Sequence, residues 1–129
     1  FLDGNNTAGE GRFKMHLFNG TKENWVETKI PGTIGDWVFM TFRYNHKTET
    51  LHIFKNGEIV FTRALTGWGR IVYNNMGDLV LGTFGFQTDP PQSSDNAQNW
   101  AQSFPGKLDN FGFYNQALTD EQIKALYNE

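Results

Sequence analysis

The sequence predicts an all-β domain built as an antiparallel two-sheet sandwich that ends in a short helix. Three observations support this prediction. Apolar and polar residues alternate in short segments separated by turn residues, as in half-buried strands. Aromatic residues make up 16% of the chain, and their rings pack well on a pleated surface. Fourteen glycines against four prolines indicate many tight turns, and 129 residues suffice for a single domain.

The strand assignments follow from the alternation. Phe13, Met15 and Leu17 alternate with polar neighbours, so one face of this segment is expected on a core and the other in water. The apolar run 37–44 is expected to be a central strand because both of its faces are mostly apolar. The full set of expected strands is 12–18, 25–30, 37–44, 51–54, 59–63, 71–73, 79–82 and 107–115.

Turn and cap residues place the connections. Asn56-Gly57 lies between two β-rich segments and predicts a type I′ hairpin, whose central residues both need positive φ. The polar, proline-broken segment 85–106 is predicted to be a long surface loop, which is often functional. Thr119 and Gln122 form a capping-box pattern and predict the start of the terminal helix.

Composition excludes several functions. The net charge of −3 and the scattered Lys and Arg residues argue against nucleic acid. No apolar run approaches the roughly 20 residues that span a bilayer, so membrane insertion is not expected. The chain has no cysteine, which excludes disulfides and cysteine-ligated zinc.

Two stretches resemble the LamG-like (laminin G-like) branch of the concanavalin A-like lectin and glucanase superfamily. The first is a hairpin of GDWVFMTFRY at 35–44 followed by LHIFKNGEIV at 51–60. The second is LVLG at 79–82 followed, after the long loop, by PGKLDNFGFYNQALTDEQI at 105–123. The order of these elements agrees with the family along roughly the last three quarters of the chain.

The resemblance implies a jelly-roll sandwich, usually secreted or attached to the cell surface within a multidomain protein. It also leads us to expect one LamG-like domain over residues 1–129 that lacks the N-terminal strands of the family and belongs to a longer polypeptide. The fold itself does not fix a ligand, because it hosts lectins, adhesion modules and hydrolases.

The acidic residues indicate which catalytic and metal sites to expect. No expected strand carries carboxylates two residues apart, as the polysaccharide-cleaving relatives do, so no catalytic residue is predicted and the chain is not expected to be an enzyme. Asp109 matches an acidic position of the family that often helps to hold a structural calcium ion. The alternative for Asp109 is a buried aspartate that accepts backbone N–H groups at the start of a strand.

The tryptophans provide the candidate ligand site. Trp68 lies between glycines and Trp100 lies in the long polar loop, so each either folds back as a plug on the sandwich or stacks on a sugar. Trp37 matches the core tryptophan of the family, whereas Trp25 is expected in the core or at its rim, with ligand contact as the alternative. The polar residues chosen as ligand contacts beside the loop tryptophans are Asp95, Asn99 and Asn75, and further polar partners in the loop are Gln87, Asp89, Gln92, Asn96, Gln98 and Gln102.

The leading hypothesis is a non-catalytic carbohydrate-binding module whose partner is a polysaccharide or oligosaccharide, with calcium as its one candidate cofactor. Two alternatives stay open. The chain could be a structural or adhesion domain that binds a protein partner, or the C-terminal part of a polysaccharide-degrading enzyme.

Overall fold

A computed structural model of the chain describes residues 2–3, 9–73 and 77–129. The chain divides into two compact units. The first, here the sandwich unit, comprises Phe1–Tyr73 and Tyr114–Glu129, and the second, here the loop unit, comprises Asn74–Phe113. The described residues form antiparallel sheets and one short C-terminal α-helix, which confirms the predicted all-β class.

The first sheet contains, in the described part of the chain, β1 (Leu2–Asp3), β2 (Glu10–Phe18) and β3 (Glu23–Pro31), in that spatial order. β2 and β3 form a regular antiparallel hairpin from Glu10 opposite Pro31 to Phe18 opposite Glu23. The connecting turn is held by Asn19, whose side-chain oxygen accepts hydrogen bonds from the backbone N–H groups of Thr21 and Lys22. This hairpin was predicted from its alternation, and it extends slightly beyond the predicted ends.

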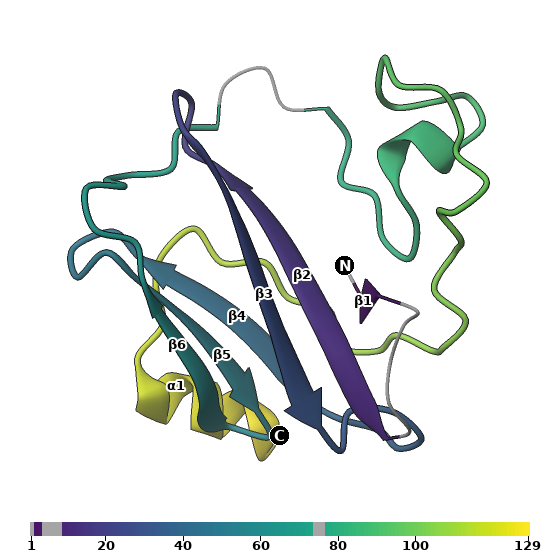
Figure 1. Ribbon diagram of the computed structural model, residues 1–129. Helices are drawn as coiled ribbons and strands as arrows, with labels where there is room; N and C mark the ends of the chain where they lie inside the picture. Colours follow the sequence, from purple (N-terminus) through teal and green to yellow (C-terminus); the bar gives the residue numbers. More distant parts are fainter. Residues whose placement is uncertain (1, 4–8, 74–76) are drawn as a thin grey trace. The chain divides into compact units, whose positions relative to one another are not determined.

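The second sheet consists, in the described residues, of β4 (Met40–Asn45), β5 (Thr50–Lys55) and β6 (Glu58–Ala64). Asn56 and Gly57 connect β5 to β6 with φ angles of 52° and 80°, which confirms the predicted hairpin turn. Figure 1 shows the two sheets as separate groups of arrows, with β1–β3 in one and β4–β6 in the other.

The core of the sandwich unit lies between the two sheets. Val26 of β3 and Leu51 of β5 are buried together with Leu65 and Trp68, which follow β6. Because these residues come from both sheets, their burial joins the sheets into a sandwich. The partly buried residues that pack against this cluster are Met15, Leu17, Tyr44 and Phe61.

The helix α1 (Asp120–Tyr127) begins at the predicted capping box. The Thr119 side chain accepts from the backbone N–H of Gln122, and the Gln122 side chain accepts from that of Thr119. Arg43 of β4 fastens the start of the helix, because its Nη1 donates to the carbonyl oxygen of Leu118 and to Asp120 Oδ1.

Three predicted strands and one core assignment were wrong. The segments 71–73, 79–82 and 107–115 are described by the structure but carry no strand. Alternation makes a segment able to pair, yet a strand forms only where a partner supplies the ladder hydrogen bonds. β4 begins at Met40, so Trp37 precedes the strand and is 67% exposed instead of belonging to the core.

Candidate functional site

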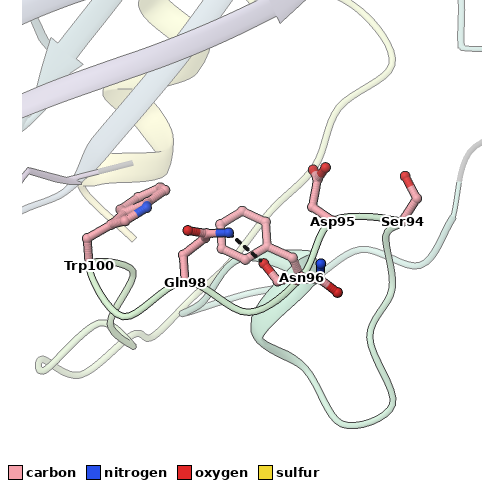
Figure 2. A pocket seen from close by; sticks show the side chains of 6 residues that line it. Ser94, Asp95, Asn96, Gln98 and Trp100 are labelled. Carbon is pink, nitrogen blue, oxygen red and sulfur yellow. Dashed lines mark hydrogen bonds between the residues drawn. The ribbon is translucent and has the colours of Figure 1, made fainter.

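The loop unit contains a pocket of about 520 Å³. This volume falls in the range of small-molecule sites, roughly 300–1,000 Å³. Two of the predicted ligand residues, Trp100 and Asp95, line it. Figure 2 shows Trp100 at one end of the row of side chains and Asp95 with Ser94 at the other. The complete lining is Phe86, Ser94, Asp95, Asn96, Gln98 and Trp100.

Trp100 is braced by two phenylalanines. Phe84 and Phe86 stack on one another with ring centroids 5.0 Å apart and an interplanar angle of 10°. The ring of Trp100 meets both in edge-on geometry, at 5.5 Å from Phe84 and 5.9 Å from Phe86. Such edge-to-face pairs are a favourable arrangement of aromatic quadrupoles. Trp100 therefore keeps a defined orientation although it is 65% exposed.

Neither Phe84 nor Phe86 was predicted as part of the site. The sequence contains a signal that could have found them, since Phe84-Gly85-Phe86 immediately precedes the polar loop. A short 3₁₀ turn, Gly85–Gln87, follows Phe84 and places the two phenylalanines close together.

Gln87 connects the two ends of the loop. Its amide nitrogen donates to the carbonyl oxygens of Gln98 and Ala101, and its amide oxygen accepts the backbone N–H of Gln98. These bonds fix the backbone on both sides of Trp100, and Ala101 is buried beside it. Gln87 was expected to be a polar partner for a sugar. Its side-chain amide instead makes hydrogen bonds within the loop and so supports the backbone around Trp100.

The polar side of the pocket comes from exposed residues of the segment 94–98. The amide of Gln98 donates to the carbonyl oxygen of Asn96 at 3.2 Å, the bond drawn in Figure 2. The backbone N–H of Asp95 donates to Ser93 Oγ at 3.3 Å. Asn99 is exposed and is not among the lining residues, and Asn75 lies outside the described residues.

Trp68 does not join this pocket. It is only 7% exposed and packs in the core of the sandwich unit, so its ring has no open face for a ligand. The ligand role predicted for Trp68 is corrected on this ground, and the alternative, a plug on the sandwich, holds. The glycines on either side of Trp68 allow the chain to fold back here, because Gly67 and Gly69 both adopt a positive φ angle of 73°.

Glu49 fixes the turn that carries Trp68. Its carboxylate accepts the backbone N–H groups of Gly67 at 2.7 Å and of Gly69 at 3.0 Å. These two hydrogen bonds lower the pKa of Glu49 below its usual value, because they stabilise the ionised form. Asn19 adds a bond from its amide to the carbonyl oxygen of Trp68.

The comparisons with known proteins agree with this architecture. The family model of the concanavalin A-like lectin/glucanases superfamily matches residues 2–124, nearly the whole chain. The chain belongs to this superfamily. No match was found among curated proteins.

One solved structure resembles this superfamily member. It is an S-layer domain-containing protein (residues 221–444) from Clostridium thermocellum, with 24% sequence identity and a TM-score of 0.44. The match covers 92% of this chain and 52% of the other, so the chain spans about half the length of that structure.

The environment of Asp109 bears on the predicted calcium site of this superfamily member. Asp109 is exposed, and its Oδ1 accepts the backbone N–H of Asn110 at 2.8 Å. Across the described residues, no group of three or more His, Asp or Glu side chains converges as a metal site would require. Calcium takes six to eight oxygens, which these side chains alone do not supply. Calcium at Asp109 therefore stays a prediction.

Within the described residues, no helix has both the length and the apolar character needed to cross a bilayer.

Proposed function

We propose that this chain is a non-catalytic carbohydrate-binding module of a secreted or cell-surface protein, and that it holds a polysaccharide or oligosaccharide in the pocket of the loop unit. The observation that carries the proposal is the composition of this pocket, in which a braced, exposed Trp100 lies beside a row of hydroxyl, carboxylate and amide groups. Membership of a lectin and glucanase superfamily supports the same ligand class.

The chemistry of the pocket suits a sugar. A pyranose has an apolar C–H face, which packs on an indole, and a rim of hydroxyls, which need donors and acceptors. Asp95 supplies acceptors, whereas Asn96 and Gln98 supply both donors and acceptors. The two kinds of partner therefore lie in one pocket, as an amphipathic ligand requires.

The same lining argues for binding rather than cleavage. Glycoside hydrolysis generally needs two carboxyl groups across the scissile bond, roughly 5–10 Å apart. Asp95 is the one acid among the residues that line the pocket. A single carboxylate can orient a hydroxyl but cannot divide the acid and base roles between two groups.

A glycan array followed by calorimetry tests the proposal. We expect Trp100→Ala to weaken binding about ten- to a hundredfold, because aromatic stacking contacts are worth about 1–3 kcal/mol. Trp37→Ala is the matched control, since Trp37 is as exposed as Trp100 but belongs to the sandwich unit. Equal affinity of Trp100→Ala and wild type would refute the pocket, and an array without any bound glycan would favour the protein-adhesion alternative.

A further inference from the structure

The outer face of the β2–β3 hairpin carries an exposed tryptophan. Along both strands, one set of alternating residues faces the core, as Met15 and Val26 do. The other set, which includes His16 and Trp25, faces away from it. Trp25 is 57% exposed, although it was expected to lie in the core or at its rim.

Trp25 is held in a fixed orientation by its cross-strand neighbour. His16 lies directly opposite it in the register, and the two rings stack at 4.3 Å with an interplanar angle of 8°. His16 Nε2 in turn lies 3.1 Å from Glu23 Oε2. His16 therefore covers part of the indole, while more than half of the Trp25 side chain stays exposed.

The charges around Trp25 are arranged in ion pairs. Arg12 pairs with Glu27, and Lys14 Nζ lies 3.9 Å from the same carboxylate. Lys29 pairs with Glu10 at 3.6 Å. Glu23 beside His16 is a third acid on this face, so the described side chains comprise three basic residues (Arg12, Lys14 and Lys29) and three acidic ones (Glu10, Glu23 and Glu27). A balanced face attracts neither polyanions nor polycations, but it offers many hydrogen-bonding groups beside an aromatic ring.

We propose that this face, here the Trp25 platform, is a second contact site for a neutral polysaccharide. The proposal rests on the carbohydrate-binding function, and it adds a site on the sandwich unit to the pocket on the loop unit. The braced indole takes the C–H face of one sugar ring, and the ion-paired Arg12 and Glu27 lie on the same face to meet hydroxyls.

Other partners fit this face less well. The cores of protein interfaces are depleted in charged residues, whereas charged side chains surround Trp25 on this face. Nucleic acids need uncompensated Lys and Arg residues to neutralise phosphates, and Arg12, Lys14 and Lys29 all have carboxylate partners here. A hydroxyl-rich, uncharged ligand is the class that uses both the ring and the paired charges.

Affinity gel electrophoresis tests the proposal, with mixed-linkage β-glucan, xyloglucan and galactomannan as neutral probes and polygalacturonate as the acidic probe. The proteins compared are the wild type, Trp25→Ala, Trp100→Ala, the double variant and Trp37→Ala as the matched control. We expect Trp25→Ala to weaken retardation by a neutral polysaccharide roughly tenfold, which corresponds to about 1.4 kcal/mol. The double variant should lose more than either single variant, and Trp37→Ala should run as the wild type.

The outcomes separate this inference from the proposed function. Retardation that Trp100→Ala weakens but Trp25→Ala does not would overturn the platform and keep the pocket. The reverse pattern would keep the platform and overturn the pocket. Failure of every neutral probe to retard the wild type, or an effect of Trp25→Ala with polygalacturonate alone, would overturn the platform as proposed.

A residue-specific measurement distinguishes a loss of binding from a folding defect. In ¹⁵N-labelled protein each tryptophan gives an indole N–H signal, which the single variants assign. Titration with an oligosaccharide of the retarding polymer should shift the Trp25 signal, whereas the signal of the buried Trp68 should stay in place. His16→Ala keeps Trp25 but removes its brace, and we expect it to weaken binding while the melting temperature stays close to that of the wild type. A Trp25 signal that does not move at saturating ligand would overturn the platform.

Discussion

Truncation of Trp68 should destabilise the sandwich far more than truncation of an exposed tryptophan. A buried tryptophan removes roughly 150–250 Å² from water, which at about 25 cal/mol/Å² amounts to about 4–6 kcal/mol. Trp68 is almost completely buried against Val26, Leu51 and Leu65, so nearly all of this hydrophobic free energy applies to it. Measured Trp→Ala changes in cores cost about 3–5 kcal/mol, a large part of the about 5–15 kcal/mol that stabilises a domain. We expect Trp68→Ala to lose about 3–5 kcal/mol of unfolding free energy.

Urea unfolding followed by circular dichroism measures this loss. Trp37→Ala is the matched control and should change the unfolding free energy by no more than about 0.5 kcal/mol, as is usual for surface positions. Trp68→Phe keeps an aromatic ring in the core and should lie between the two, so it gives a value even if Trp68→Ala does not fold. Equal stability of Trp68→Ala and Trp37→Ala would refute the plug role, and loss of sugar binding by a fully stable Trp68→Ala would restore the ligand role.

Three further predictions concern the supports of the two units. Gln87→Ala removes the hydrogen bonds that hold the backbone beside Trp100, and it should weaken glycan binding about tenfold in calorimetry. Unchanged affinity would show that the loop holds its shape without these bonds. The lowered pKa of Glu49 means that its stabilising contribution is fully present above the pKa of the unfolded chain and is lost as the pH falls through the lower folded pKa. Glu49→Gln should therefore flatten the acid side of a plot of melting temperature against pH, and an unchanged slope would contradict the assignment. If Asp109 binds calcium, millimolar calcium should raise the melting temperature relative to EDTA in the wild type but not in Asp109→Asn. A wild-type melting temperature that is the same in calcium and in EDTA would refute the calcium site.

The features that the sequence predicted well are those determined by local chemistry. Asn56-Gly57 formed the expected hairpin turn because few other residue pairs accept positive φ at both positions. Thr119 and Gln122 formed the expected helix cap because the two side chains and the two N–H groups lie within one turn. In each case the partners are separated by three residues or fewer, so no information from distant parts of the chain is needed.

The segments 79–82 and 107–115 show that a strand-like sequence pattern does not guarantee a strand. Both carry alternating or continuous apolar residues, as strands do, yet the structure describes them without a ladder partner. Strand pairing depends on which segment lies alongside, and the sequence pattern of a segment does not contain that information. The strand predicted from Trp37 onward began only at Met40 for the same reason, since its partner β5 ends at Lys55, opposite Met40.

The tryptophans show that local context also does not determine exposure. Trp68 and Trp100 both lie among glycine or polar residues, yet one is a core plug and the other an exposed wall of a pocket. Trp25 lies in a regular strand and is exposed nonetheless. The feature that distinguishes the candidate ligand residues is an aromatic brace: His16 stacks on Trp25, and Phe84 and Phe86 hold Trp100. Trp37 is equally exposed but makes no ring contact within the described residues. A braced ring loses little freedom when a ligand stacks on it, so we expect affinity to depend on the bracing contacts rather than on the exposed fraction alone. The two braced tryptophans should therefore bind sugar, whereas Trp37 should not.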